Sequence, residues 1–545
     1  MKKQTICKTS TIAGLLLSLS ACSKPQVEIP AAQSLPDSLV SVTVPDVHKT
    51  IDAAQKLSDQ ILPENLQVDL KAKLGASLND PQLSSIPNGS GALCIWDGIL
   101  WYAALECDPK QNALLSQFAS DSKLLGAVEG NLFLLAKYPQ GIAAAKAQAP
   151  AISQYLKNRK TAGIFVDLRL SELVEKFRPQ INLAIMMLPN MMAQGVAQSS
   201  STQVANAQSM AKISEAEIRI FTSLGSQIEH LEIQLLPLEE GVEIIHNFTA
   251  KEASNLYAVI TAPDSVKPDP KISVEALPPG VFEIEMFVGN PEAMQHFGQQ
   301  EFQQLIEEMP LEEAQISFWE EMFALWPNFF NGSMVETFTM VPEAGVTMGY
   351  LVSVQENDKL LRTLANMPVL MEPFMEMYRE MGMPMNVEVL MDARKYKDHS
   401  VHQYNIQYDL ENMDPLVAEQ LKAMNFSEMK SEFTIADGRW LWTMGDFPLD
   451  TLIDAVEKGK KQGGHLEAKT FYPEGGIGYY DIDMDAYLDY MISLTILDEA
   501  DEIIQSWAEY FENSPPLVGA FYKQENRVQS RLLIPAEMLQ KSSGK

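Results

Sequence analysis

The chain has 545 residues, a length that indicates about two to four domains. Its residues are 46% hydrophobic and 21% charged, proportions that exclude wholesale disorder and are ordinary for a globular protein. It carries 41 lysines and arginines against 72 aspartates and glutamates, a formal net charge of −31. Because so acidic a surface repels phosphate backbones, the composition argues against nucleic-acid binding.

The N-terminal segment has the pattern of a secretory signal. Three lysines among the first eight residues precede an apolar run from Ile12 to Leu19, which is too short to span a bilayer. Residues 19–22, Leu-Ser-Ala-Cys, resemble the lipobox of bacterial lipoproteins. The resemblance implies cleavage after residue 21, acylation of Cys22 and, because Ser23 is not an aspartate, sorting to the outer membrane. It covers only residues 1–23.

The chain after this signal peptide (1–21) is expected to form a tether and two domains. Residues 22–44 contain three prolines and no apolar period, so they are predicted to be a tether. Two helices are expected next, at 46–61 and 64–78. A proline-rich run at 262–271 predicts a linker between a first domain at 45–261 and a second at 272–541.

The two halves share sequence patterns. Gly130–Pro139 resembles Gly438–Pro448: each has a turn glycine, an apolar strand and a proline that opens a helix. Gly163–Leu173 resembles Gly478–Leu488, each a strand, a polar cap and an amphipathic helix, and Gly349–Leu361 is a candidate third copy. We therefore predict an internal duplication.

Paired strands with one polar face define the expected fold class. Glu217–Ser223 with Glu229–Leu235 is one predicted pair, and Leu517–Tyr522 with Arg527–Leu533 is another. An antiparallel sheet with helices on one side is the natural packing for this pattern. The predicted class is α+β, with two related modules of antiparallel sheet covered by long helices.

Two cysteines, Cys94 and Cys107, lie in the predicted body, and in an oxidising compartment two such cysteines usually pair. However, Asp97-Gly98 has the pattern of a two-residue hairpin turn, which would set Cys94 opposite Trp101. The disulfide between Cys94 and Cys107 is therefore a candidate that needs a third strand or a bend.

Catalytic and cofactor motifs are absent from the sequence: there is no Gly-x-Ser-x-Gly, Walker, His-Glu-x-x-His or Gly-x-Gly-x-x-Gly pattern. His399 and His402 are the closest histidines, but three positions apart on a predicted strand they point to opposite faces. Asp481, Asp483 and Asp485 lie between a strand and a helix, where helix capping is the simpler interpretation and acid–base chemistry or Ca²⁺ binding the alternative. We therefore assign no catalytic residue, cofactor or metal site.

Methionine is the unusual component, with 28 in the chain. A predicted helix at 369–381 has an apolar arc wider than a surface helix needs, and the segment 183–192 is apolar nearly all round. Three interpretations remain open: flexible core filling, an adaptable groove for an apolar ligand, and capture of Cu(I) or Ag(I). The candidate ligand face consists of Met371, Phe374, Met375, Met377 and Met381.

Together these patterns predict an acylated outer-membrane lipoprotein, attached to the membrane through its N-terminal lipid. Its body is expected to face the periplasm, to be non-catalytic, and to bind an apolar ligand or a cell-envelope protein partner. The alternatives are a structural or assembly component of the envelope and, less favoured, an envelope hydrolase or a Cu(I)/Ag(I)-binding protein.

Overall fold

The computed structural model describes residues 38–540 apart from several gaps. The gaps are 62–67, 79, 81, 111, 159–160, 196–214, 216–217, 309–312, 314–315, 318–319, 321–331, 342–344, 381, 414, 424–426, 473 and 494–510. Among the described residues, every helix falls short of the length and apolar character that crossing a membrane requires.

The described residues form two compact units, each assembled from separate stretches of chain. The smaller unit contains described residues within 38–176, 228–251 and 529–540, and the larger contains those within 177–227 and 252–528. The predicted linker at 262–271 lies within the larger unit, where Asp269 pairs with Arg439 at 2.7 Å. The domain limits 45–261 and 272–541 stay predictions.

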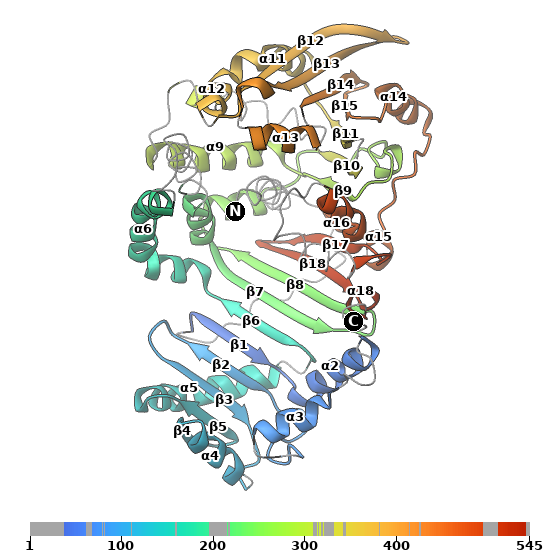
Figure 1. Cartoon of the computed structure of the whole chain (residues 1–545). Helices are drawn as coiled ribbons and strands as arrows, with labels where there is room; N and C mark the ends of the chain where they lie inside the picture. The colour runs from blue at the N-terminus through green and yellow to red at the C-terminus, as the bar shows by residue number, and fades with distance from the viewer. Residues whose placement is uncertain are drawn as a thin grey trace. The chain divides into compact units, whose positions relative to one another are not determined.

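The smaller unit is built on an antiparallel sheet with the strand order β4-β5-β3-β2-β1-β6-β7-β8, and β18 pairs with β8. Figure 1 shows β6, β7 and β8 side by side. Its strands are β1 (Val40–Val44), β2 (Ala92–Trp96), β3 (Trp101–Glu106), β4 (Leu125–Glu129), β5 (Leu132–Ala136), β6 (Ile164–Leu168), β7 (Ile228–Pro237), β8 (Gly241–Ala250) and β18 (Arg527–Pro535). The helices of this part of the chain are α2 (Val47–Ile61), α3 (Leu70–Ser77), α4 (Asn112–Asp121), α5 (Pro139–Asn158), α6 (Leu170–Gly195, which continues into the larger unit) and α18 (Ala536–Gln540).

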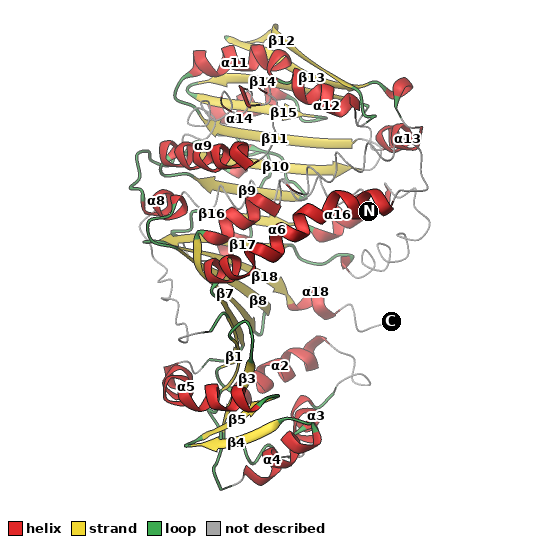
Figure 2. Ribbon diagram, turned by 90° about the vertical axis from the view of Figure 1, so that its left-hand side faces the viewer, coloured by secondary structure: helices red, strands yellow, loops and turns green. Residues whose placement is uncertain are grey.

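Helices pack on both faces of this sheet around β5. Helix α5 lies against β3 and β5 (Figure 2), where Ile152 and Leu156 pack on Leu132 and Leu134. Helix α4 packs on the other face, against Phe133. Successive residues of β5 point to opposite faces and all are apolar, so both faces need a cover.

The larger unit has a second antiparallel sheet, with the order β17-β16-β9-β10-β11-β15-β14-β13-β12. Its strands are β9 (Phe282–Phe287), β10 (Ser333–Val341), β11 (Gly345–Ser353), β12 (Met385–Tyr396), β13 (His399–Tyr408), β14 (Glu428–Ala436), β15 (Arg439–Met444), β16 (Gly478–Ile482) and β17 (Leu517–Gln524). Its helices are α8 (Asn255–Thr261), α9 (Pro291–Glu308), α11 (Asn357–Leu370), α12 (Glu372–Glu380), α13 (Pro415–Ala423), α14 (Leu449–Lys458), α15 (Ala468–Phe471) and α16 (Met484–Ser493), with short 3₁₀ turns η1 (Val274–Ala276) and η2 (Leu410–Asn412).

Strand β15 of this sheet packs against a helix on each of its faces. Leu441 points into a cluster with α14, whereas Trp440 and Trp442 pack on the opposite face with α11. The prediction of helices on one side only is therefore wrong, because apolar residues occupy both alternating sets of this strand.

The mixed α+β class with antiparallel sheet is confirmed. The predicted strand at Glu217–Ser223 is wrong: residues 218–226 are helical, and Arg219 pairs with Glu215 one turn earlier at 2.9 Å. The helix expected at 64–78 begins at Leu70, where the Asp69 carboxylate caps it by accepting from the Ala72 N–H at 2.8 Å.

Candidate functional site

The two body cysteines are free thiols, so the candidate disulfide between Cys94 and Cys107 is not formed. Cys94 is exposed on β2 opposite Ala103, while the buried Cys107 lies four residues beyond Ala103. Four residues of extended chain cover about 13 Å, beyond the roughly 7 Å that a disulfide allows between Cα atoms. The hairpin also differs from the predicted two-residue turn, since Trp101 pairs with Trp96. Cys22 lies outside the described residues.

The candidate methionine face divides between core and undescribed positions. Met375 is only 6% exposed and packs with Met385 and Val387 of β12, and Met371 contacts the same cluster. Flexible core filling is therefore the interpretation that the structure favours for these two residues. The side chains of Phe374 and Met377, and all of Met381, lie outside the described part, so their role in a ligand face stays a prediction.

A pair of buried carboxylates fastens a loop of the larger unit to its sheet. Asp481 on β16 lies directly opposite Glu283 on β9, and they are 6% and 5% exposed. Asp481 accepts the backbone N–H of Ala468 at 3.0 Å, and Glu283 accepts that of His465 at 2.8 Å. Burial raises the pKa of both carboxyls, that of Asp481 to about 6, and the facing Glu283 adds to the shift.

The other two aspartates of this group also bind backbone N–H groups. Asp483 accepts from Ala486 at 3.0 Å in the first turn of α16, and Asp485 accepts from Asn513 at 2.6 Å. Among the described residues, no three His, Cys, Asp or Glu side chains are arranged to hold a metal ion.

Replacing Asp481 with asparagine is expected to remove a pH dependence of stability. Its pKa is about 6 when folded and about 3.9 when unfolded, so the folded state keeps a proton that the unfolded state releases between these values. The group's stabilising contribution is thus present below about pH 4 and is lost, by roughly 2–3 kcal/mol, as the pH rises through 6. Urea unfolding of both proteins, below pH 4 and above pH 6, measures the effect. Relative to the wild type, the variant is expected to have a higher free energy of unfolding at the higher pH than at the lower pH. A gap independent of pH would contradict this account.

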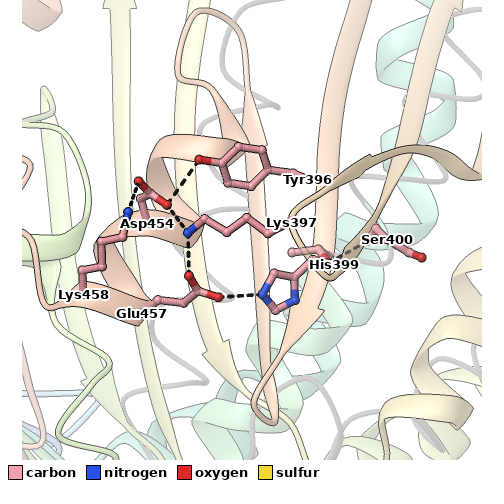
Figure 3. A network of polar contacts seen from close by, with 8 residues as sticks. Tyr396, Lys397, His399, Ser400, Asp454, Glu457 and Lys458 are labelled. Carbon is pink, nitrogen blue, oxygen red and sulfur yellow. Dashed lines mark hydrogen bonds and ion pairs between the residues drawn. The ribbon is translucent and has the colours of Figure 1, made fainter.

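An ion-pair network ties the β12–β13 hairpin to α14 (Figure 3). Asp454 accepts from Lys397, Lys458 and Tyr396, the last at 3.3 Å. Glu457 accepts from Lys397 at 2.7 Å and contacts the His399 ring nitrogen at 2.8 Å. These cations hold the pKa of the Asp454 carboxyl well below its usual range, so each carboxylate is occupied by protein donors and the network is structural.

His402 faces away from this network, as three-residue spacing on a strand predicts. It is 4% exposed, its Nδ1 accepts from the Asp392 N–H at 2.9 Å, and it packs against Phe433 with ring centroids 5.1 Å apart. Burial lowers its pKa. The two histidines therefore serve separate structural contacts.

Sequence reasoning missed one titratable side chain, Glu336 on β10. It lies opposite Tyr350 and Ile284 in the sheet, within a row that also includes Tyr480, and burial raises its pKa to about 7. A single acid inside an otherwise uncharged strand is the sequence signal that could have revealed it. Such shifts occur in functional and structural sites alike, so Glu336 alone defines no reaction.

The smaller unit contains a row of buried polar side chains. Ser41, Asp167, Glu232 and Asn247 lie opposite one another on four adjacent strands, and each is less than a tenth exposed. Asp167 Oδ1 is 3.7 Å from the Nδ1 of His230, which is longer than a direct hydrogen bond. A one-residue slip of any of these strands would break the row, so it helps to specify register.

A patch of exposed apolar side chains lies on α6. Leu183, Met186 and Met187 are 53%, 68% and 49% exposed, and their spacing places them on one side of the helix. Ile185, on the other side, is buried.

Comparisons with protein-family models, with curated protein sequences and with solved structures gave no match.

Proposed function

We propose that the protein is an acylated lipoprotein of the outer membrane whose non-catalytic, periplasm-facing body binds an apolar segment of another envelope protein. The lipobox-like residues 19–22 support the anchor and the compartment. The exposed patch of Leu183, Met186 and Met187 carries the binding proposal, because large apolar side chains at helical spacing otherwise turn inwards.

Methionine suits such a surface. Its unbranched thioether chain adapts to differently shaped partners, and helices commonly dock through side chains at positions i, i+3 and i+4. An apolar binding surface is therefore better supported on α6, within the apolar segment 183–192, than at the candidate ligand face of residues 371–381.

A protein partner is favoured over a small apolar ligand. Two shallow hollows in the described part of the chain are lined mainly by polar and charged residues. One is formed by Gln355, Glu356, Asn357, Asp358, Lys359 and Arg362, and the lining of the other includes Asp409, Glu411 and Glu428. Neither has the apolar lining that an acyl chain requires.

Placing a charge on the α6 patch tests this function. Met186→Glu is expected to weaken partner binding about tenfold or more, because a carboxylate at an apolar contact is desolvated without compensation. Ala184→Glu adds the same charge at an exposed position off the patch and is the matched control. The partner is captured by crosslinking in intact cells, and its affinity is then measured with purified proteins.

The outcomes separate the alternatives. If Met186→Glu melts as the wild type does and keeps the same partner at the same affinity, the patch is not the binding surface. If the wild type co-purified with a bound lipid and Met186→Glu did not, the ligand of the patch would be a lipid and not a protein. A structural role for the body predicts that neither substitution changes any association.

We also propose that the two units are related modules that arose by duplication and are each covered by helices. The support is the shared order: β4-β5-β3-β2-β1-β6-β7 corresponds to β14-β15-β11-β10-β9-β16-β17, with β12–β13 as an added hairpin. Asp167 and Asp481 occupy equivalent register positions, each three residues before the following helix. An alignment of relatives that pairs these two aspartates would support the duplication, and one that consistently separates them would oppose it.

A further inference from the structure

Four large apolar side chains are exposed at one end of the smaller unit's sheet. Ile99 is 81% exposed, Trp101 36%, Leu125 41% and Tyr138 51%. The pairs Trp96–Trp101 and Leu125–Ala136 place the β2–β3 turn, the start of β4 and the segment after β5 at the same sheet end. We call these four residues the apolar tip.

The hairpin that presents Ile99 is firmly held. The Asp97 carboxylate accepts the backbone N–H groups of Ile99 at 2.8 Å and Leu100 at 2.7 Å, and Gly98 supplies a φ of +94°. Lys176 donates to the Asp97 carbonyl at 2.8 Å and closes over the turn. These hydrogen bonds fix the conformation of the turn, and with it the exposed position of Ile99.

The charges beside the tip differ from those of the chain as a whole. Three exposed lysines are close to it: Lys137 Nζ lies 5.6 Å from the Tyr138 ring centroid, Lys176 donates to the Asp97 carbonyl, and Lys123 precedes Leu125 by two residues. Exposed Asp121 precedes Leu125 by four residues, whereas the Asp97 carboxylate is occupied by the turn. Tryptophan, tyrosine and lysine together are the side chains typical of a membrane interface.

The chain enters the body at this same end. Ser38 is the first described residue, and the Leu39 N–H donates to the Trp96 carbonyl at 3.0 Å, next to the β2–β3 turn. Residues 23–37 separate Cys22 from this point and span at most about 55 Å even when fully extended. A lipid on Cys22 therefore keeps the tip within reach of the membrane surface.

We infer that the apolar tip docks into the headgroup–acyl boundary of the phospholipid bilayer that holds the anchor. Ile99, Trp101, Leu125 and Tyr138 enter the boundary, and the lysines contact lipid phosphates. Docking would orient the smaller unit with this sheet end at the membrane and would offset locally the repulsion between an acidic body and anionic lipid. This inference rests on the proposed lipid anchor.

A photo-crosslinking amino acid tests the docking in the full-length, acylated protein. We expect benzoylphenylalanine at position 99 to form lipid adducts in vesicles of phosphatidylethanolamine and phosphatidylglycerol. The matched control is position 238, because Leu238 is 37% exposed and lies beyond β7 at the opposite end of the same sheet. It is expected to form few adducts.

A second arm measures the contribution of Ile99. With the crosslinker at position 138, Ile99→Asp is expected to lower the lipid-adduct yield by up to about tenfold, since burying one such side chain is worth about one factor of ten in an equilibrium. The site is exposed in the folded protein, so the substitution leaves the fold intact, which an unchanged melting temperature verifies.

Four results would overturn the inference. Equal lipid labelling at positions 99 and 238 would mean nonspecific proximity, and protein adducts in place of lipid at position 99 would mean a different occupant. Absence of lipid adducts at position 99, in protein whose Cys22 is acylated, would refute the docking while leaving the proposed anchor in place. An unmodified Cys22 in the cellular protein would instead refute the proposed function, and the docking with it.

Discussion

Replacing Cys22 with alanine is expected to abolish residence of the protein in the outer-membrane fraction. The lipobox resemblance places the lipid on the sulfur of this residue, and alanine offers no atom to carry it. Two or three acyl chains anchor a protein stably, so their loss is expected to release it. Density-gradient fractionation of envelopes measures the change.

Cys94→Ala is the matched control, because it removes an exposed thiol from the body and leaves residues 19–22 unchanged. It is expected to keep the wild-type distribution. If Cys22→Ala co-fractionated with the outer membrane as the wild type does, the anchor would have to lie elsewhere in the chain.

Gly241→Ala is expected to destabilise the smaller unit by about 4 kcal/mol or more, the sum of a strained backbone and a forced displacement. Gly241 has a φ of +147°, and a Cβ there would lie 2.0 Å from the carbonyl oxygen of Ile534 in β18. Because this neighbour is backbone, relief of the clash requires β8 and β18 to separate. Thermal or denaturant unfolding measures the loss.

Gly130→Ala is the control that separates the backbone strain of a positive φ from the steric clash of an added Cβ. Gly130 also has a positive φ, +63°, but an added Cβ would meet nothing within 4 Å. Its substitution is expected to cost only about 1–2 kcal/mol. Equal losses for the two variants would show that the close approach of β18 to Gly241 contributes nothing.

Local sequence signals predicted the strand–helix units well. Gly130–Pro139 contains β5 and the start of α5, and Gly438–Pro448 contains β15 and precedes α14 directly. In both, a turn glycine, an apolar run and a proline act within a few residues, so no distant contact is needed. Gly349–Leu361 is likewise a strand followed by a helix, but β11 pairs with β10 and β15, so its place in the sheet does not match the other repeats.

Features that depend on contacts between residues far apart in the sequence were predicted less well. Nothing local reveals that Asp481 accepts a hydrogen bond from the backbone of Ala468, or that Glu336 lies opposite Tyr350 in the sheet. Met375 looked available because its helix is broadly apolar, yet β12 buries it against Met385. The hairpin register that separates Cys94 from Cys107 was misjudged by two residues, since a turn type cannot be read from Asp97-Gly98 alone.

The anchored, partner-binding account depends first on the chemistry of one residue. Mass spectrometry of the N-terminal peptide, from protein extracted from outer membranes with detergent, tests it most directly. The account predicts a mature chain that begins at Cys22 and carries a diacylglyceryl thioether and an acylated amino group. A peptide that retains residues 1–21, or one that begins at an unmodified Cys22, would contradict it.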